Sequence, residues 1–467
     1  MKDAKRVFFV VLALLVVGVG MNVPLPEGMP EPARAAIVDL LFLIVLWIGE
    51  AVPKPVASVL AMLMLAWLGA VDTFGEAIKL FVSDVFFFLL AAFGIAAAVA
   101  HSPLPHRICS WFIKRFRHNT KGLLLGFMAV TALISTMISD LAACALFASI
   151  ASPLLKRIDR EDEGAMRFAK CLMMGIPMAS LSGGIMTPIG SPSNITLLGL
   201  LHQTSNIEIS FLGWLIVGVP MGVICLVLGW FFLCMVFKPQ LSHDVSDSFG
   251  MDVEKVVQMG GQEKKLVAFL IGMFVFWAVQ GSLGILSSTQ VAVIGFIVLF
   301  LPCVNLLTWD SYEQQVPWDL VLMLGGVMAA GSALIQSGGL QWIVESLTRY
   351  SDGWHPVVFL AVVSAFIIVE RAFVPMAPPV TIALSPIFMA IAMSVGLHPL
   401  CIALCVSIWC QVTYLFPVFD ACWLISYSEG YYTVAEVAKW GWALTLIILA
   451  LSLVLLPSLS SVASLLP

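Results

Sequence analysis

The chain has 467 residues, of which 61% are hydrophobic and only 11% are charged, and its formal net charge is −5. Soluble proteins carry a charged fraction of about a quarter, so this composition excludes a soluble globular domain and predicts an all-α, polytopic membrane protein. No Cys-x-x-Cys pair, Cys/His cluster, nucleophile–base motif or phosphate-binding glycine loop occurs in the sequence. We therefore expect no disulfide framework, zinc site, organic cofactor, catalytic residue or nucleic-acid partner, and no enzymatic activity.

Four apolar segments open the chain, and each is separated from the next by a short polar or proline-containing break. They lie near residues 7–23, 34–52, 56–71 and 83–101. Lys2, Lys5 and Arg6 place the N-terminus in the cytoplasm, and the basic residues that follow the fourth segment agree with an even number of crossings. The opening is similar to a signal peptide, but no Ala-x-Ala-like cleavage site follows it. We interpret residues 1–33 as an uncleaved N-terminal transmembrane helix.

The next apolar stretch, residues 122–155, has strongly basic loops on both sides. Its two ends should therefore lie on the same, cytoplasmic face of the membrane, yet it is too short to cross the bilayer twice. We expect a re-entrant helical hairpin with a polar tip at Ser135–Leu141. The tip contains Asp140, and an aspartate at membrane depth is a functional-site hypothesis by default.

Residues 168–201 are expected to form a broken transmembrane helix. Between Ser182 and Thr196 the sequence reads S-G-G-I-M-T-P-I-G-S-P-S-N-I-T. Proline removes a backbone donor and glycine relaxes the backbone, so a continuous helix is disfavoured here. A broken helix persists at membrane depth only where protein or a water-filled cavity surrounds it. Its freed amides, carbonyls and hydroxyls are then available to bind an anion or a small cation.

The second half of the chain repeats the first. Three pairs of positions occur in the same order at a nearly constant separation: Asp84 with Asp319, Ser152-Pro153 with Ser385-Pro386, and Thr187-Pro188 with Phe416-Pro417. The first unit starts outside the cell and the second starts in the cytoplasm, so the repeats are inverted. Inverted repeats combined with broken helices and midplane polar residues indicate a secondary transporter.

These assignments divide the chain into a first inverted repeat at 34–237, a cytoplasmic linker at 238–265 and a second inverted repeat at 266–467. The second repeat should contain a hairpin at 356–388 and a broken helix at 398–427. About eleven transmembrane helices and two re-entrant hairpins result. The C-terminus then lies outside, and the protein is expected in the cytoplasmic (inner) membrane, in contact with its lipids.

The arrangement resembles the divalent-anion:sodium symporter family of di- and tricarboxylate transporters over nearly the whole chain. The most specific match is G-G-I-M-T-P-I-G-S-P-S-N at 183–194, and supporting matches are Pro53–Pro55, the stretch Trp318–Gly326 and the positions of the two hairpins. The resemblance implies a homodimer in which a transport domain moves against a scaffold as an elevator. It also implies a small anionic substrate and Na⁺ as a coupling ion.

The resemblance and the chemistry of the charged residues near the hairpin tips together nominate site residues. Candidate substrate-binding residues are Ser139, Thr187, Ser191, Ser193, Asn194 and Arg371. Candidate cation-binding residues are Ser135, Ser139, Asp140 and Gly184.

The chain departs from the family at its hairpin tips, which carry Ser-Asn-Thr in both halves of family members. The first tip has Ser139, Asp140 and Leu141, and the second has Ala372, Phe373 and Val374 followed by Pro375. The second break, Tyr414–Cys422, also lacks the Thr/Pro/Asn pattern. We therefore expect at most one Na⁺, bound by the first half, or coupling to protons or to exchange.

Three charged residues have alternative interpretations. Asp140 is a cation ligand, a proton carrier, or a partner of a basic residue on another helix. Arg371 offers a forked donor for carboxylate, sulfonate or phosphate oxygens, or forms a structural pair with Glu370 or Asp420. Asp420 is a proton or counter-ion site, or the N-cap of the helix that follows it.

The favoured function is secondary transport of small anions, such as di- or tricarboxylates, by an elevator mechanism, with cation coupling or exchange. The alternative is a cation/proton antiporter or an ion channel of the wider ion-transporter superfamily. The hydroxyl and amide donors of the first break favour an anion over a cation as the substrate.

Overall fold

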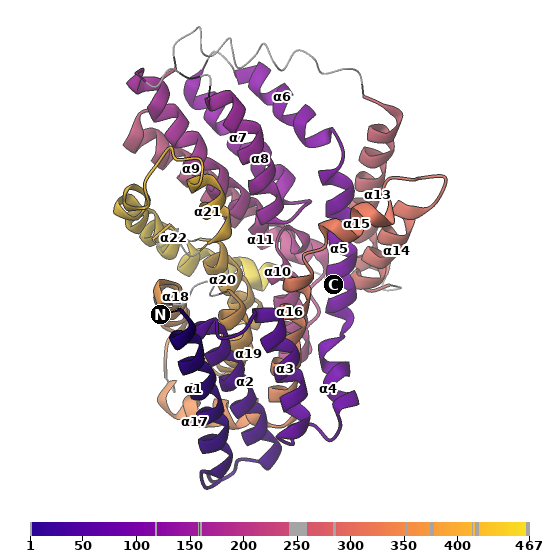
Figure 1. Cartoon of the computed structure of the whole chain (residues 1–467), viewed down its shortest axis with the longest axis vertical. Coiled ribbons are helices and arrows are strands. Elements are labelled where there is room, and N and C mark those ends of the chain that lie inside the picture. The colour runs from indigo at the N-terminus through magenta and orange to yellow at the C-terminus, as the bar shows by residue number, and fades with distance from the viewer. Residues whose placement is uncertain are drawn as a thin grey trace.

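The computed structural model describes residues 2–116, 119–156, 158, 161–241, 259–283, 286–351, 353–373, 378–412, 414–415 and 420–463. The regular secondary structure of these residues consists of helices, without strands, joined by turns and irregular segments (Figure 1). The helices of the first half are α1 (Lys2–Asn22), α2 (Glu31–Gly49), α3 (Lys54–Trp67), α4 (Phe74–Phe81), α5 (Asp84–Ala100), α6 (Leu104–Phe116), α7 (Thr120–Ser135), α8 (Asp140–Leu155), α9 (Glu163–Met186), η1 (Pro188–Gly190), α10 (Pro192–Ser205) and α11 (Phe211–Phe237). Those of the second half are α13 (Gly261–Leu283), α14 (Ser288–Phe300), α15 (Trp309–Gln315), α16 (Trp318–Gln336), α17 (Gly339–Ser351), α18 (Pro356–Phe373), α19 (Pro378–Ser394), α20 (Pro399–Gln411), α21 (Ala421–Tyr427) and α22 (Val434–Ala463).

Several of these helices are long and apolar enough to cross a membrane. By length and composition, six helices within the described ranges qualify: α1, α2, α9, α11, α16 and α22. The pair α4 and α5, bent by 42° at its break, makes a seventh. The expected number of about eleven spans includes shorter apolar helices, so that count remains a prediction.

The predicted hairpin at 122–155 consists of two short helices, α7 and α8, which contact each other and both pack against α9. The chain turns between them at 136–139. Ser139 begins α8 as its N-cap, because its Oγ accepts a hydrogen bond from the Ala142 amide at 3.3 Å. Gly183 of α9 allows the close approach of α7, since a Cβ at this position would lie 2.2 Å from the Ala132 carbonyl oxygen.

The helix expected at 168–201 is interrupted between α9 and α10. α9 ends at Met186, the 3₁₀ turn η1 follows, and α10 begins at Pro192. Thr187 stabilises the turn, because its Oγ1 accepts a hydrogen bond from the Gly190 amide at 2.9 Å. The two prolines begin η1 and α10, where a missing amide hydrogen is tolerated.

The second half contains similar pairs of helices. α18 and α19 occupy the expected hairpin, although α19 continues to Ser394, beyond the expected end at 388. α20 and α21 flank the expected second break. The echo Phe416-Pro417 and the tip residues Val374 and Pro375 lie outside the described residues.

The two halves interlock through these elements. α10 packs against α19 and α20 of the second half, whereas α21 packs against α8 and α9 of the first. In Figure 1, α7 and α8 lie in the upper part of the molecule and α18 and α19 in the lower part. The second half of each broken helix therefore contacts the hairpin of the other half.

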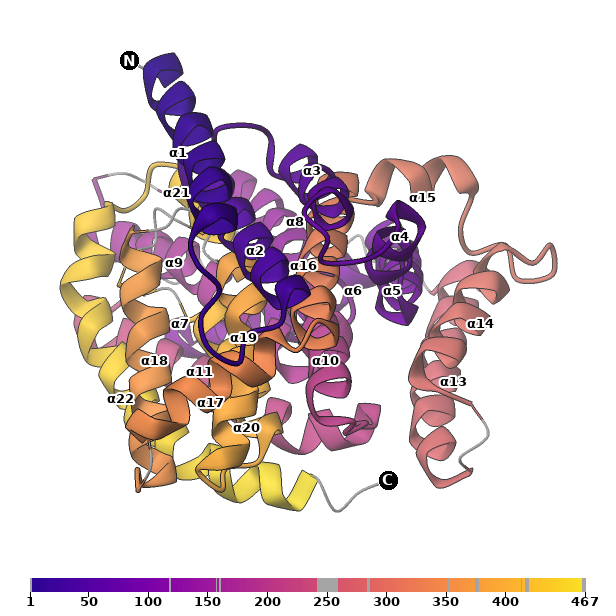
Figure 2. The same ribbon diagram turned by 90° about the horizontal axis from the view of Figure 1, so that it is seen from below.

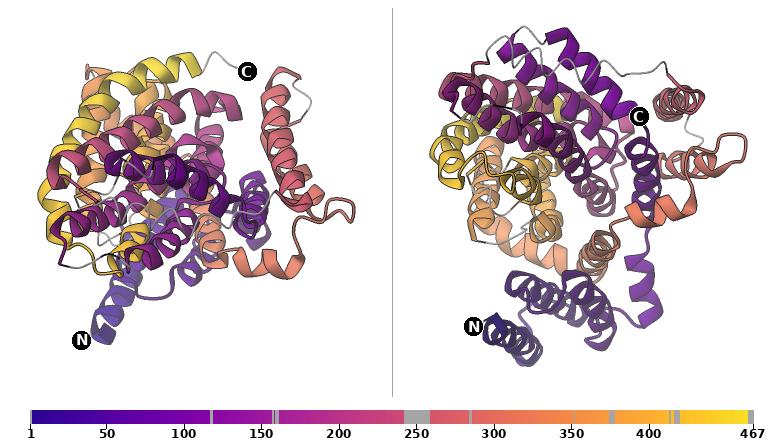
Figure 3. Two further views of the ribbon diagram at one scale, coloured as in Figure 1. Left: turned by 90° about the horizontal axis from the view of Figure 1, so that it is seen from above. Right: turned by 45° about the horizontal axis from the view of Figure 1, so that its top comes forward.

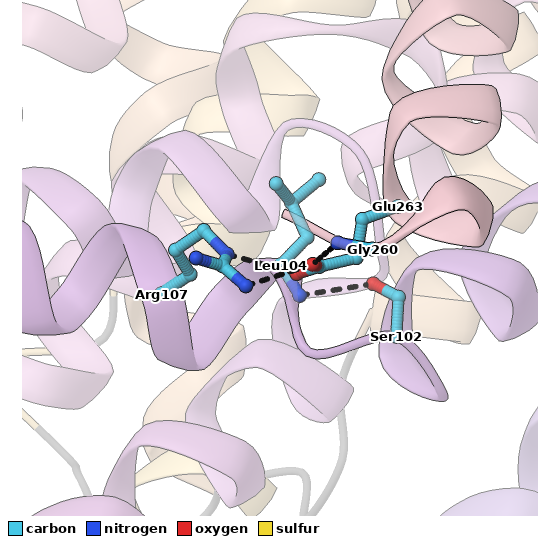
Figure 4. A network of polar contacts seen from close by, with 5 residues as sticks. All are labelled: Ser102, Leu104, Arg107, Gly260 and Glu263. Atoms are coloured by element: carbon cyan, nitrogen blue, oxygen red, sulfur yellow. Dashed lines mark hydrogen bonds and ion pairs between the residues drawn. The ribbon is translucent and has the colours of Figure 1, made fainter. Parts of the chain in front are cut away.

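The pair α13 and α14 stands at one side of the molecule, and α22 lies at the opposite side (Figures 2 and 3). α14 joins this pair to the rest by packing against α5. The start of α13 is held to α6, because Arg107 donates from Nε and Nη2 to the two carboxylate oxygens of Glu263 at 2.9 and 2.8 Å (Figure 4). The Gly260 amide donates to the same carboxylate at 2.9 Å.

Candidate functional site

A cavity of about 150 Å³ lies between the two halves of the chain. It is lined by residues from both halves: Asp140, Leu141, Leu181, Ser191, Pro192, Ser193, Leu320, Met323, Leu324, Arg371, Pro379, Ile382, Cys410, Gln411, Asp420, Ala421 and Cys422. The lining therefore includes five residues that the sequence nominated from four separate segments, namely Asp140, Ser191, Ser193, Arg371 and Asp420.

Helix N-termini converge on this cavity. The first turns of α8, α10 and α19 contribute lining residues, and so do Asp420 and the start of the short helix α21. A helix N-terminus carries a positive partial charge of roughly half a unit. Asp140 neutralises this charge on α8, but α10 and α19 have no acidic residue in the first turn. α10 and α19 thus present positive potential to the cavity.

Arg371 and Asp420 form an ion pair across the cavity wall. Nη2 of Arg371 lies 3.5 Å from Oδ2 of Asp420, and the two side chains are 6% and 12% exposed. Asp420 also caps α21, because its Oδ1 accepts from the amides of Cys422 and Trp423 at 2.9 and 3.4 Å. Nη1 of Arg371 is buried and has no hydrogen-bond partner in the described part of the chain. The structure therefore contains both the ion pair and the N-cap, and Nη1 of the guanidinium remains without a partner among the described residues.

Asp140 and Gln411 face each other over Gly184. A Cβ at Gly184 would lie 3.2 Å from Oδ2 of Asp140 and 3.1 Å from Nε2 of Gln411, so a larger residue there would require both side chains to shift by a few tenths of an ångström. Oδ1 of Asp140 accepts from the Leu141 amide at 2.7 Å. Nε2 of Gln411 is buried without a partner among the described residues.

Sequence reasoning does not identify Gln411. It is the last residue of α20, P-L-C-I-A-L-C-V-S-I-W-C-Q, in which the other polar side chain is Ser407. A single amide at the end of an apolar helix is the available signal, because polar side chains within membrane segments are costly.

The other nominated residues lie behind the cavity and make hydrogen bonds within the protein. Asn194 is fully buried: Nδ2 donates to the carbonyls of Gly184 at 2.7 Å and Thr187 at 2.9 Å, and Oδ1 accepts from Ser407 at 2.6 Å. Thr187 donates to the Thr136 carbonyl at 2.7 Å. Ser135 donates to the Ser180 carbonyl at 2.6 Å. These three side chains and Ser139 are not part of the cavity lining.

A family model for the sodium:sulfate symporter transmembrane region matches residues 4–462. The chain belongs to this family, the divalent-anion:sodium symporters. Two relatives are named sodium-dependent dicarboxylate transporter SdcS. The relative from Staphylococcus saprophyticus is 25% identical over 449 residues, which is 90% of this chain and 85% of that protein. The relative from Staphylococcus aureus strain USA300 is 24% identical and covers the same shares, 90% and 85%.

Two solved structures share the fold of this symporter-family chain. MtrF of Neisseria gonorrhoeae has a TM-score of 0.55 at 13% identity and covers 98% of this chain and 94% of its own. YdaH of Alcanivorax borkumensis has a TM-score of 0.56 at 11% identity and covers 92% and 98%. Family membership and the apolar helices make the protein a multi-pass membrane transporter and not an enzyme.

Proposed function

We propose that this symporter-family protein is a secondary active transporter that moves a small anion across the cytoplasmic membrane. The observation that carries the proposal is the meeting, in one cavity, of Arg371 with the N-terminal turns of α10 and α19. A guanidinium and fixed amides at a helix N-terminus bind anions in proteins. The start of α10 offers such an amide at Ser193, whereas α19 begins with Pro378-Pro379, which have no amide hydrogen, so α19 contributes only its helix dipole. Ser191 and Ser193 add hydroxyl donors at the start of α10.

The charges of the cavity support coupling to a cation. Two carboxylates, Asp140 and Asp420, and one guanidinium, Arg371, line the cavity. Because Arg371 already pairs with Asp420, the charge of Asp140 is not balanced by a lining residue. An anion that enters raises the negative charge further, so Na⁺ or a proton at Asp140 would stabilise the loaded state. The names of the SdcS relatives favour Na⁺.

For a Na⁺ site, the candidate ligands around Asp140 are the nominated residues Ser135, Ser139 and Gly184. The Gly184 carbonyl accepts one hydrogen bond from Asn194 and retains a second lone pair. Oγ of Ser135 donates its proton to Ser180 and can still accept or coordinate. One site in the first half would then couple to the anion, with no counterpart in the second.

Transport would follow an elevator mechanism, in which the hairpins and broken helices carry the cavity past a scaffold within a homodimer. The cross-packing of α10 on α19 and of α21 on α8 supports a single moving unit, because neither half can shift without the other. In this arrangement α7–α8 opens to the cytoplasm and α18–α19 to the outside, which is the expected orientation of inverted repeats. The N-terminus is cytoplasmic and the C-terminus is outside.

A cation/proton antiporter is the second candidate, because Asp140 and Asp420 line the same cavity. The ion pair of Asp420 with Arg371 argues against it, since an arginine repels a cation from the second carboxylate. An uptake screen in proteoliposomes separates the two. Radiolabelled dicarboxylates, citrate, sulfate and sulfonates would be offered with and without a Na⁺ or proton gradient. Gradient-driven uptake of an anion is expected, whereas Na⁺/H⁺ exchange without anion uptake would overturn the proposal.

A further inference from the structure

One wall of the cavity is apolar. Leu320, Met323 and Leu324 are spaced at i, i+3 and i+4 on α16, so they lie on one face of this helix. α16 packs beside both α10 and α19, which contribute the positive helix ends. Leu181 and Ile382 extend the apolar surface.

The polar side of the cavity has few donors with free capacity. Nη1 of Arg371 is buried, lines the cavity and lacks a partner within the described residues. Arg371 is only 5% exposed. A buried donor without a partner costs free energy that a ligand oxygen can recover. A guanidinium suits an anion with more than one oxygen. Gln411 and Ser191 also line the cavity, but both lie beside the Asp140 carboxylate.

A second anionic group would lack a comparable partner. Arg371 is the one cationic side chain among the described lining residues, and the two other charged ones are carboxylates. The hydroxyl donors Ser191 and Ser193 are neutral, and Ser191 lies beside Asp140. A ligand with two anionic ends would therefore place its second charge near the Asp140 carboxylate or against the apolar wall of α16. Both placements are unfavourable, because a buried charge requires a charged or hydrogen-bonding partner.

We infer that the substrate is an organic anion with one anionic group, a carboxylate or a sulfonate, and an apolar body. The anionic group binds Arg371, and the body packs against Leu320, Met323 and Leu324. This inference rests on the proposed anion transport and names the substrate class of the same cavity. It differs from the dicarboxylates in the names of the SdcS relatives.

Pentanoate and glutarate are matched probes, because they have the same chain length and differ by a second carboxylate. Binding to the purified protein would be measured by calorimetry in buffers with and without Na⁺. Pentanoate is expected to bind at least tenfold more tightly than glutarate. From propanoate to pentanoate the affinity should rise about fourfold for each methylene, as for burial of apolar surface. The neutral pentanamide should not bind.

The outcomes separate this inference from the proposed function. Glutarate binding as tightly as pentanoate, or an affinity independent of chain length, would overturn the inference while anion transport stands. If succinate, citrate, sulfate and the monocarboxylates all fail to bind to folded protein, both proposals are wrong.

Variants of the wall provide an independent test. Met323→Gln is nearly isosteric and makes the wall polar, so it should remove most of the gain in affinity from propanoate to pentanoate. Leu320→Ala is a smaller change at a partly exposed position. It should also reduce the rise in affinity from propanoate to pentanoate, but by less than Met323→Gln does. Met393→Gln is the control, because Met393 is 43% exposed on α19 outside the lining. An unchanged chain-length dependence in folded Met323→Gln and Leu320→Ala would contradict the inference.

Discussion

Arg371 of α18 and Asp420 at the start of α21 form a buried ion pair, with Nη2 and Oδ2 3.5 Å apart, at the wall of the cavity. The pair holds the guanidinium in place and also reduces its net charge. An anion in the cavity therefore competes with Asp420 for Arg371. The free Nη1 gives the anion a contact that does not require the pair to break.

The variant Asp420→Asn tests this competition. Asparagine is as good an N-cap as aspartate, so α21 should remain capped. Arg371 loses its counter-charge, and loss of one partner of a buried pair costs about 3–5 kcal/mol. We expect a lower melting temperature without ligand and a larger rise on addition of anion than in the wild type. A variant that no anion stabilises would show that Asp420 itself is needed for binding.

Gly184→Ala should displace the side chains of Asp140 and Gln411, which face each other over this glycine. The new Cβ would lie 3.1 Å from Nε2 of Gln411 and 3.2 Å from Cβ and Oδ2 of Asp140, so both side chains must shift. Transport should fall at least tenfold at low Na⁺ and recover in part at high Na⁺, because Asp140 is displaced and not removed. Gly272→Ala on α13 is the control, since a Cβ there meets no atom within 4 Å. Equal transport in both variants would place the coupling ion elsewhere.

Asn194→Ala and Thr187→Ala should weaken anion binding by about 1–3 kcal/mol each, through the geometry of the first break. Asn194 holds the carbonyls of Gly184 and Thr187 and accepts from Ser407 of α20. We therefore also expect a lower melting temperature for Asn194→Ala, because these groups lose a buried partner.

A double-mutant cycle with Ser407→Ala checks this origin of the effect. Ser407→Ala should cost less stability in the Asn194→Ala background than alone, because the shared hydrogen bond is already lost. Additive losses would indicate that the Asn194–Ser407 contact contributes nothing to stability.

Uptake as a function of Na⁺ concentration at fixed pH measures the number of coupling ions. One carboxylate, Asp140, is left without a cationic partner in the cavity lining, so a Hill coefficient of about one is expected. A coefficient clearly above one would contradict the single site. An uptake rate that does not depend on Na⁺ concentration, together with loss of uptake in Asp140→Asn, would identify the proton as the coupling ion.

Local features of the sequence predict the local structure of the site well. The break between α9 and α10 follows from the density of proline and glycine, and the turn before α8 follows from a polar tip within an apolar run. Four short helices, α4, α6, α15 and α17, were not predicted, because their mixed polar composition is similar to that of loops. Basic residues at 107, 114 and 115 suggest a loop, yet Leu104, Cys109 and Ile113 form one buried face of α6.

Which side chains face the cavity depends on tertiary packing, and the sequence predicts this less well. Thr187, Ser191, Ser193 and Asn194 are equivalent donors in the sequence, but α10 turns the serines to the cavity and Asn194 to α20. The sequence does not identify Gln411 as a site residue, because Asp140 and Gly184, which it contacts in the structure, lie far away in the sequence.

Binding of an anion to purified Arg371→Gln tests the central claim most directly. Calorimetry would use whichever anion the wild type takes up, with Arg115→Gln, an exposed position on α6, as the control. We predict that Arg371→Gln folds and lowers the affinity at least a hundredfold, because it removes the cationic partner of the anion, while Arg115→Gln binds normally. Wild-type affinity in folded Arg371→Gln would contradict the account.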